Sequence, residues 1–169
     1  MLKPAILYAD QIKQKMYGIW HNEKYKFYNY YSYWAGYNPK EDTWSANEFV
    51  SVNDNDEVIG FIQYEINRST NSANALGIIN FTDDISLTFG KDVLQVLKDI
   101  FEKYKFHKLS FSVVIGNPIE KTYDKFINKF GGRIVGIEKE HTKLVDGLYY
   151  DVKKYEILNS EYQKKKLTK

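Results

Sequence analysis

The sequence predicts an α/β protein with a mixed sheet of about six or seven strands, flanked by helices and centred on a βαβ unit. Two observations predict it. An apolar run of β-forming residues, Ala75 to Phe81, is followed by a helical pattern and then by a second strand pattern, His107 to Ile115. A strand, a crossover helix and a strand in one sheet run parallel, so these two strands should be neighbours. Turn signals on both sides of the unit favour antiparallel hairpins.

Aromatic residues dominate the first part of the chain. Ala5 to Tyr8 is a short strand or a lead-in, and Asp10 is placed to cap a helix over Gln11 to Trp20. The stretch from Tyr25 to Tyr37 reads YKFYNYYSYWAGY. One helix cannot bury all its faces in a domain of this size, so some of these rings are expected to line a cleft. For any single ring, packing in the core is the alternative.

A hairpin precedes the βαβ unit. Its strands are Glu48 to Val52 and Val58 to Ile66, joined by a turn of Asn and Asp residues. Arg68 to Asn74 is expected to be a polar loop, and the strand after it to run from Ala75 to Thr82. The turn that leads from this strand into the central helix ends at Gly90.

The central helix is strongly amphipathic. Its apolar residues recur with the one-face spacing of a helix, at Val93, Val96, Leu97, Ile100, Phe101 and Tyr104. The free N–H groups at such a helix start, together with the helix dipole, can bind an anion. A plain strand-to-helix connection is the alternative.

The last third of the chain predicts a helix and a hairpin. The helix runs from about Ile119 to Phe130 and is stopped by a pair of glycines. The strands Arg133 to Leu144 and Leu148 to Leu158 are joined across Asp146-Gly147, a strong hairpin signal. Residues from about 160 to 169 are rich in lysine and are expected to form a flexible basic tail.

Composition limits the function classes. The 169 residues form one domain, and a net charge of +2 argues against a nucleic-acid partner. The absence of cysteine excludes disulfides, a thiol nucleophile and Cys-based metal sites. The three His residues lack ligand-like spacing, so no metal is expected. No signal peptide or membrane-length apolar segment is apparent, so a cytoplasmic protein without a membrane partner is expected.

From Val58 to Leu158 the order of elements and three segments resemble the GNAT superfamily of N-acetyltransferases. Ile79 to Leu97 aligns without gaps with the family's strand, pyrophosphate loop and helix. Gly116 to Gly132 resembles its strand end with an Asn, followed by a helix. Lys143 to Leu158 resembles its closing hairpin. The resemblance implies a single GNAT-like acetyltransferase domain over residues 1–169.

The chain departs from the family in two motifs. The family loop reads Gln/Arg-x-x-Gly-x-Gly/Ala, whereas Ile85 and Thr88 stand at its first and second defined positions and only Gly90 is kept. Lys91 could partly replace the lost cation. In the later helix, Ile127 falls where many members have the Tyr that protonates the CoA thiolate, and Tyr123 lies one turn upstream on the same face.

The resemblance implies an acyltransferase that moves an acetyl group directly from acetyl-CoA to a primary amine. Its cofactor-binding residues would be Phe81, Thr82, Ser86, Leu87, Thr88, Phe89, Gly90, Lys91 and Asn117. For catalysis it implies Tyr123 as general acid and a backbone N–H near Asn80 or Phe81 to polarise the thioester. Glu65 is the candidate base, with Asp83 and Asp84 as alternatives. The acceptor site would use Tyr28, Tyr31 and Trp34.

Two other functions stay open at this point. A GNAT-like domain with a degraded loop could serve as an inactive interaction module. The aromatic stretch, with its interleaved lysines, could bind a nucleic acid or a peptide. The acceptor could be a small molecule or a peptide amine, and the closing hairpin offers an edge for a homodimer.

Overall fold

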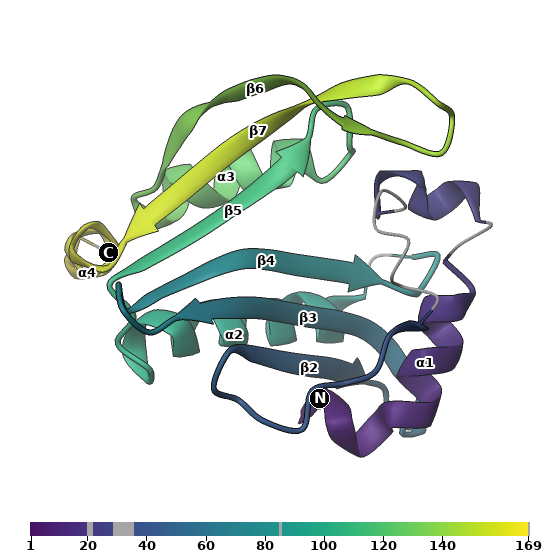
Figure 1. Ribbon diagram of the computed structural model, residues 1–169. Helices are drawn as coiled ribbons and strands as arrows, with labels where there is room; N and C mark the ends of the chain where they lie inside the picture. Colours follow the sequence, from purple (N-terminus) through teal and green to yellow (C-terminus); the bar gives the residue numbers. More distant parts are fainter. Residues whose placement is uncertain (20–21, 29–35, 85, 169) are drawn as a thin grey trace.

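The computed structural model describes residues 1–19, 22–28, 36–84 and 86–168. They form a seven-stranded sheet in the order β1-β2-β3-β4-β5-β7-β6 (Figure 1). The predicted mixed sheet is confirmed, since β4 and β5 are parallel and the other paired strands are antiparallel. The strands are β1 Leu2–Pro4, β2 Ala46–Val52, β3 Val58–Asn67, β4 Ser72–Asn80, β5 Lys108–Val114, β6 Arg133–Lys143 and β7 Tyr149–Leu158.

Helices cover both faces of the sheet. The α-helices are α1 Ala9–Tyr17, α2 Leu87–Glu102, α3 Glu120–Phe130 and α4 Asn159–Leu167, and two 3₁₀ segments are η1 Ala5–Tyr8 and η2 Glu23–Tyr28. Successive residues of β3 face opposite sides. Phe61 therefore packs with α1, while Ile62 packs with α2 and α3. Figure 1 shows α2 and α3 behind the sheet and α1 in front of it.

Several predicted boundaries are wrong at the first two helices. Asp10 is not a cap: α1 starts at Ala9, directly after the η1 turn, so Asp10 lies inside its first turn. Gly90 does not end the turn before α2 either. Ser86 is the N-cap of α2, and its hydroxyl accepts a hydrogen bond of 3.2 Å from the Phe89 N–H. Gly90 therefore lies within the first turn of the helix.

The strand β4 begins at Ser72, earlier than its sequence indicates. Ser72 and Ala73 are polar or small, but both are buried because β3 and β5 pair with them on either side. The ladder between β4 and β5 contains only the pairs Ser72–Lys108 and Ala73–Leu109. Beyond them the two strands diverge, as the gap between their ribbons in Figure 1 shows.

The predicted flexible tail is instead the helix α4. Tyr162 is 5% exposed, its ring stacks on Phe101 at 4.6 Å, and its hydroxyl donates a 2.6 Å hydrogen bond to Glu102. Lys166 also pairs with Glu102, at 2.9 Å. The composition of the segment indicates solvation, whereas one buried aromatic ring and its acidic partner on α2 hold it as a helix.

Candidate functional site

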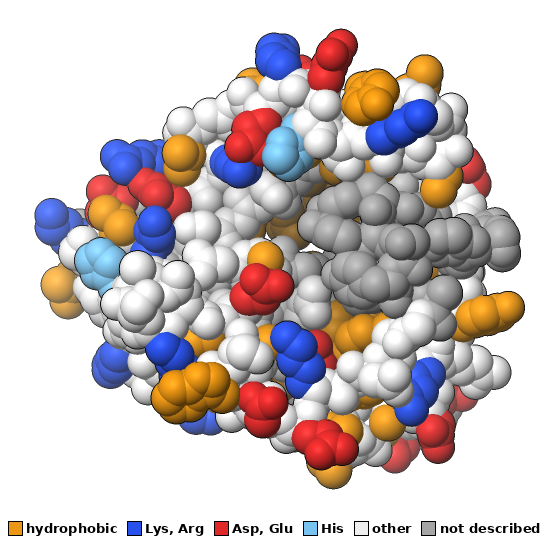
Figure 2. All heavy atoms as spheres, viewed as in Figure 1, with side chains coloured by type: hydrophobic (Ala, Val, Ile, Leu, Met, Phe, Trp, Pro, Cys, Tyr) orange, Lys and Arg blue, Asp and Glu red, His pale blue; other side chains and the backbone are white. Residues whose placement is uncertain are grey.

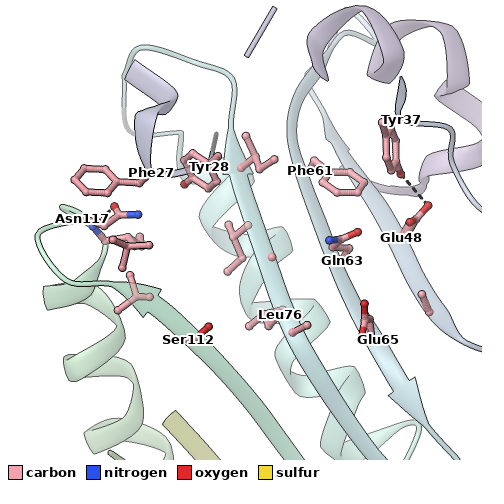
Figure 3. Close-up of a pocket in the computed structure, with 18 of the residues that line it drawn as sticks. Phe27, Tyr28, Tyr37, Glu48, Phe61, Gln63, Glu65, Leu76, Ser112 and Asn117 are labelled. Atoms are coloured by element: carbon pink, nitrogen blue, oxygen red, sulfur yellow. Dashed lines mark hydrogen bonds between the residues drawn. The ribbon is translucent and has the colours of Figure 1, made fainter. Parts of the chain in front are cut away.

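A cavity of about 640 Å³ lies where β4 and β5 diverge. Residues 75–79 of β4 and 112–114 of β5 form its walls, and side chains of β2 and β3 continue one wall (Figure 3). Phe27 and Tyr28 of η2 lie at one end, close to Asn117 at the start of α3. The cavity therefore joins the aromatic segment predicted to line a cleft with the diverging strands of the βαβ unit.

A bulge shapes the β4 wall. Gln63 pairs with Gly77 but Glu65 pairs with Asn74, so β4 has one residue more than β3 between these pairs. Ala75, inside the bulge, has a φ of 51°. An irregularity of this kind bends the strand and increases its twist, which accounts for the early end of the ladder with β5.

The rest of β4 presents an unpaired backbone edge to the cavity. The Phe81 N–H donates a 3.0 Å hydrogen bond to the Ile59 carbonyl. Because bonded and non-bonded pairs alternate in an antiparallel ladder, the backbone groups of Ile78 and Asn80 point away from β3, toward β5. These groups can pair with an extended ligand that carries amides. The Phe81 N–H is engaged, which leaves Asn80 as the predicted donor that faces the gap.

The other residues predicted after β4 form the turn into α2. The Asn80 side-chain oxygen accepts hydrogen bonds from the Thr82 N–H and hydroxyl, at 3.0 and 2.8 Å. Phe81 packs with the core cluster that includes Tyr25. Asp83 forms a 2.9 Å ion pair with Lys24 of η2, away from the cavity lining. Neither Asp83 nor Asp84 lines the cavity.

The residues predicted to bind an anion lie at the exposed start of α2. The N–H groups of Leu87 and Thr88 precede the first intrahelical bonds of α2, and both side chains are exposed. Lys91 is also exposed on this turn. A Cβ added to Gly90 would meet no atom within 4 Å, so an approaching phosphate would find open space there. Phe89 differs from its neighbours, because its ring is buried in the core.

Gly90→Ala is expected to stabilise the protein while weakening the affinity for CoA that the resemblance of the sequence implies. Alanine in a helix is about 0.5–1 kcal/mol better than glycine, and nothing in the fold opposes the added methyl group. The same methyl group would occupy the approach to the N–H groups of α2. Melting temperature and CoA affinity, measured together, check this prediction. A CoA affinity equal to that of the wild type would place the anion site elsewhere.

Tyr123 and Asn117 lie together in the cavity wall. Tyr123 is 8% exposed, and its ring packs edge-on against Phe111 at 5.1 Å. Burial raises the pKa of its hydroxyl, and in the described part of the chain that hydroxyl makes no hydrogen bond. The Asn117 side-chain oxygen accepts a 3.1 Å hydrogen bond from the Ile119 N–H, which starts α3. Ile127, at the family's usual Tyr position, is buried in the core instead.

Acidic and polar side chains line the opposite wall, and most of them escaped prediction. Glu65 was a candidate base, whereas Glu48 and Gln63 were not identified. Glu48 pairs with Gln63 across the β2–β3 ladder, and Glu65 lies two residues further along β3, so all three share one face. Alternation within the predicted hairpin could have placed Glu65 beside Gln63. The facing of Glu48 depends on register, which the turn alone does not determine.

Aromatic residues and a hydrogen-bonded loop lie at the side of the cavity where the sequence predicts the acceptor site. Tyr28 lines the cavity, and burial, with a smaller effect of Tyr25, raises its pKa to about 12. Glu48 accepts hydrogen bonds of 2.8 Å from the Tyr37 hydroxyl and the Lys40 N–H (Figure 3). Tyr31 and Trp34, the other predicted acceptor residues, lie outside the described residues.

Three features of the described chain bear on binding to nucleic acids, membranes and metals. Figure 2 shows acidic and basic side chains interspersed over the viewed face of the described chain, without a continuous basic area. Among the described residues, no helix is long and apolar enough to cross a membrane. In the same residues, His, Asp and Glu side chains form no group of three that could hold a metal ion.

Comparisons with known proteins give structural matches. No protein-family model and no curated protein matches the chain. A solved structure of spermidine N-acetyltransferase from Vibrio cholerae, in complex with CoA and spermine, is 22% identical, covers 96% of this chain and 97% of its own, and has a TM-score of 0.74. A chimera of that enzyme with hSSAT matches over the same shares at 22% identity, with a TM-score of 0.72. The chain has the GNAT fold.

A third match agrees. Mutant forms of the Vibrio cholerae spermidine/spermine N-acetyltransferase SpeG are 25% identical over 73% of this chain and 70% of theirs, with a TM-score of 0.61. The predicted GNAT-like fold is thus confirmed over nearly the whole chain, including the N-terminal part that carried no motif.

Proposed function

We propose that the protein is an acetyl-CoA-dependent N-acetyltransferase that moves an acetyl group directly to a primary amine. The observation that carries this proposal is the cavity between β4 and β5. It is lined by the unpaired edge of β4 and by Tyr123, and the exposed N-terminus of α2 follows the end of the same strand. An extended ligand with a pyrophosphate group, an arm that contains amides and a reactive end would match this order of groups.

The residues present fit acetyl-CoA. The N–H groups of Leu87 and Thr88, with Lys91, would hold the pyrophosphate, and the backbone edge at Ile78 would pair with the pantetheine amides. Asn117 lies in the cavity wall, where its amide nitrogen could bind the same arm. Bound acetyl-CoA supplies an acetyl group activated as a thioester. The backbone N–H of Asn80, which faces the gap, would polarise its carbonyl.

The protein's own residues then handle the protons. An amine with an ordinary pKa is protonated at neutral pH and must lose a proton before its nitrogen attacks the acetyl carbon. Glu65, exposed at the cavity wall, accepts that proton directly or through water. As the carbon–sulfur bond breaks, the Tyr123 hydroxyl would donate a proton to the departing thiolate, and the second proton that the nitrogen loses as the amide forms would return to Tyr123 through water. Alignment of the amine with the thioester supplies most of the rate enhancement.

A small polyamine is the acceptor class that the wall favours. Glu48 and Glu65 lie on one face of neighbouring strands, and the aromatic rings of Tyr28 and Tyr37 lie at the same cavity. Carboxylates bind ammonium groups, and aromatic faces attract cations. The structural neighbour from Vibrio cholerae was solved in complex with CoA and spermine. A chain of methylenes between two ammonium groups would match this mixture of acidic and apolar surface.

Glu48→Gln is expected to raise KM for spermidine about tenfold with little change in kcat, because a charge-assisted hydrogen bond contributes about 1.5–3 kcal/mol. Glu65→Gln is expected to lower kcat as well, since it removes the proposed base. Steady-state kinetics with spermidine and with a monoamine check both. Asp54→Asn makes the same charge change in the exposed β2–β3 turn and should alter neither constant. Equal effects on monoamine and polyamine would argue against a second ammonium site.

The proposed function is tested by binding and then by turnover. Acetyl-CoA at about 100 times its dissociation constant should stabilise the protein by about 2.7 kcal/mol in a thermal-shift titration, and CoA should do the same whereas ATP should not. Thiol release with spermidine, spermine and a monoamine then identifies the acceptor. No shift with millimolar acetyl-CoA would overturn the enzyme proposal and leave a GNAT-fold interaction module.

We also propose that the protein forms a homodimer through β6. This edge strand has 11 residues, and Ile134, Val135 and Ile137 on it are 48, 57 and 47% exposed. Long exposed edges with apolar side chains tend to pair with another strand. Light scattering should give twice the chain mass, and Ile137→Lys should halve it. Leu7→Lys, at an exposed site outside the strand, should not. A monomeric wild type would contradict this proposal.

A further inference from the structure

Lys153 is a partly buried cation that the proposed chemistry does not use. It lies on β7 with its side chain 12% exposed, between the sheet and α3. Its ammonium group forms an ion pair with Glu120 and lies 3.3 Å from the Asp124 carboxylate. Its pKa is raised, chiefly by the hydrogen bond to Glu120, and the pKa of Glu120 is lowered by the same bond. Lys153 and Glu120 are therefore both charged at neutral pH.

The two carboxylates flank Tyr123 along α3. Glu120 precedes it by three residues, which is nearly one turn, and Asp124 follows it directly. Glu120 also accepts a 3.2 Å hydrogen bond from the Gly116 N–H, in the loop that carries Asn117. Lys153 thus connects β7 to α3 at two positions, one before and one after Tyr123.

The Tyr123 ring is packed by the same network. The Tyr155 hydroxyl donates a 2.8 Å hydrogen bond to Asp124, and its ring stands edge-on to Tyr123 at 6.1 Å. Phe111 packs on both rings, at 5.1 Å from each. Packing limits how far Tyr123 can tilt, but aromatic contacts allow a helix to rotate slightly about its axis. The ion pairs of Lys153, on β7, with Glu120 and Asp124, on α3, oppose that rotation of the helix.

We propose that Lys153 is a positioning residue for acetyl transfer, which sets the rotation of α3 so that the Tyr123 hydroxyl faces the reacting end of the cavity. The inference rests on the proposed function. The hydroxyl lies far from the helix axis, so a small rotation moves it by an ångström or more. A misplacement of about 1 Å can reduce a rate by about a hundredfold.

Lys153→Met is expected to lower kcat by about tenfold or more, with KM for acetyl-CoA changed by less than about threefold. Lys153→Arg, which keeps the charge, should restore most of kcat. Lys154→Met is the matched control, because Lys154 is the next residue on β7, faces the other side and pairs with Glu138 at 2.6 Å. It should leave kcat unchanged.

A double-mutant cycle separates positioning from general loss of structure. If Lys153 acts through Tyr123, Lys153→Met should cost less than about twofold in kcat in a Tyr123→Phe background. An equal loss in both backgrounds, or an unchanged kcat in the single variant, would overturn the inference. A wild type that binds acetyl-CoA but transfers nothing would overturn the proposed function and this inference together.

A second variant guards against misfolding. Lys153→Met leaves the partly buried Glu120 and Asp124 carboxylates without their cation, which is destabilising. Combining it with Glu120→Gln and Asp124→Asn removes both charges, so the melting temperature should return toward the wild-type value. The loss of kcat should persist in this variant. Recovery of kcat along with stability would show that Lys153 is only structural.

Discussion

Tyr123→Phe is expected to lower kcat for acetyl transfer by about a hundredfold, because a positioned general acid contributes about 10²–10⁴ to a rate. The substitution removes one oxygen and keeps the ring that packs on Phe111, so the fold and the melting temperature should stay close to those of the wild type. KM for acetyl-CoA should change little. Thiol release under saturating acetyl-CoA and amine measures kcat.

The pH dependence sharpens this prediction. Burial raises the pKa of Tyr123 above the ordinary value for tyrosine, so the folded protein favours its neutral, proton-bearing form. Tyr123 therefore stays competent as an acid through neutral and moderately alkaline pH, and wild-type kcat should not fall from its ionisation below about pH 10. Tyr104→Phe, at a surface tyrosine 37% exposed, is the control. A Tyr123→Phe variant with wild-type kcat would show that water protonates the thiolate.

Gly60→Ala is expected to destabilise the protein and to weaken its affinity for CoA at the same time. A Cβ at Gly60 would lie 2.2 Å from the ring of Phe89, which is 7% exposed and has little room to move. Overpacking of this kind costs about 1–3 kcal/mol. Phe89 belongs to the first turn of α2, so displacing it would also move the proposed pyrophosphate site. Thermal melting and a CoA titration measure the two effects.

Replacing the Phe89 ring by a smaller side chain should reverse both effects. In the double variant Gly60→Ala, Phe89→Leu, the smaller side chain makes room for the added methyl group, so stability and CoA affinity should recover in part relative to Gly60→Ala. Gly136→Ala is the matched control. Gly136 lies on another strand, β6, and a Cβ added there would meet no atom within 4 Å. A stable Gly60→Ala protein with normal CoA binding would mean that α2 does not depend on this contact.

Local signals were enough to predict the elements around the site. The hairpin across Asp146-Gly147 needs a residue with positive φ, and Gly147 has a φ of 79°. The stop of α3 needs the same, and Gly131 has a φ of 81°. The parallel neighbours β4 and β5 follow from the handedness and length of one βαβ unit. In each case the physical cause acts within a few residues or within one connection.

The tertiary structure alone decided the chemistry of the cavity. Glu48 faces the cavity because of its register with Gln63, and the bulge at Ala75 ends the ladder with β5, neither of which a turn or a periodicity specifies. The basic end of the chain forms the helix α4 because the Tyr162 ring stacks on the Phe101 ring. The sequence by itself determined the order of the main strands and helices and the turns at Gly131 and Gly147, since these depend on short-range backbone preferences. The placement of Glu48 and Lys153 depends on contacts between residues far apart in the chain, which exist only after the sheet has assembled.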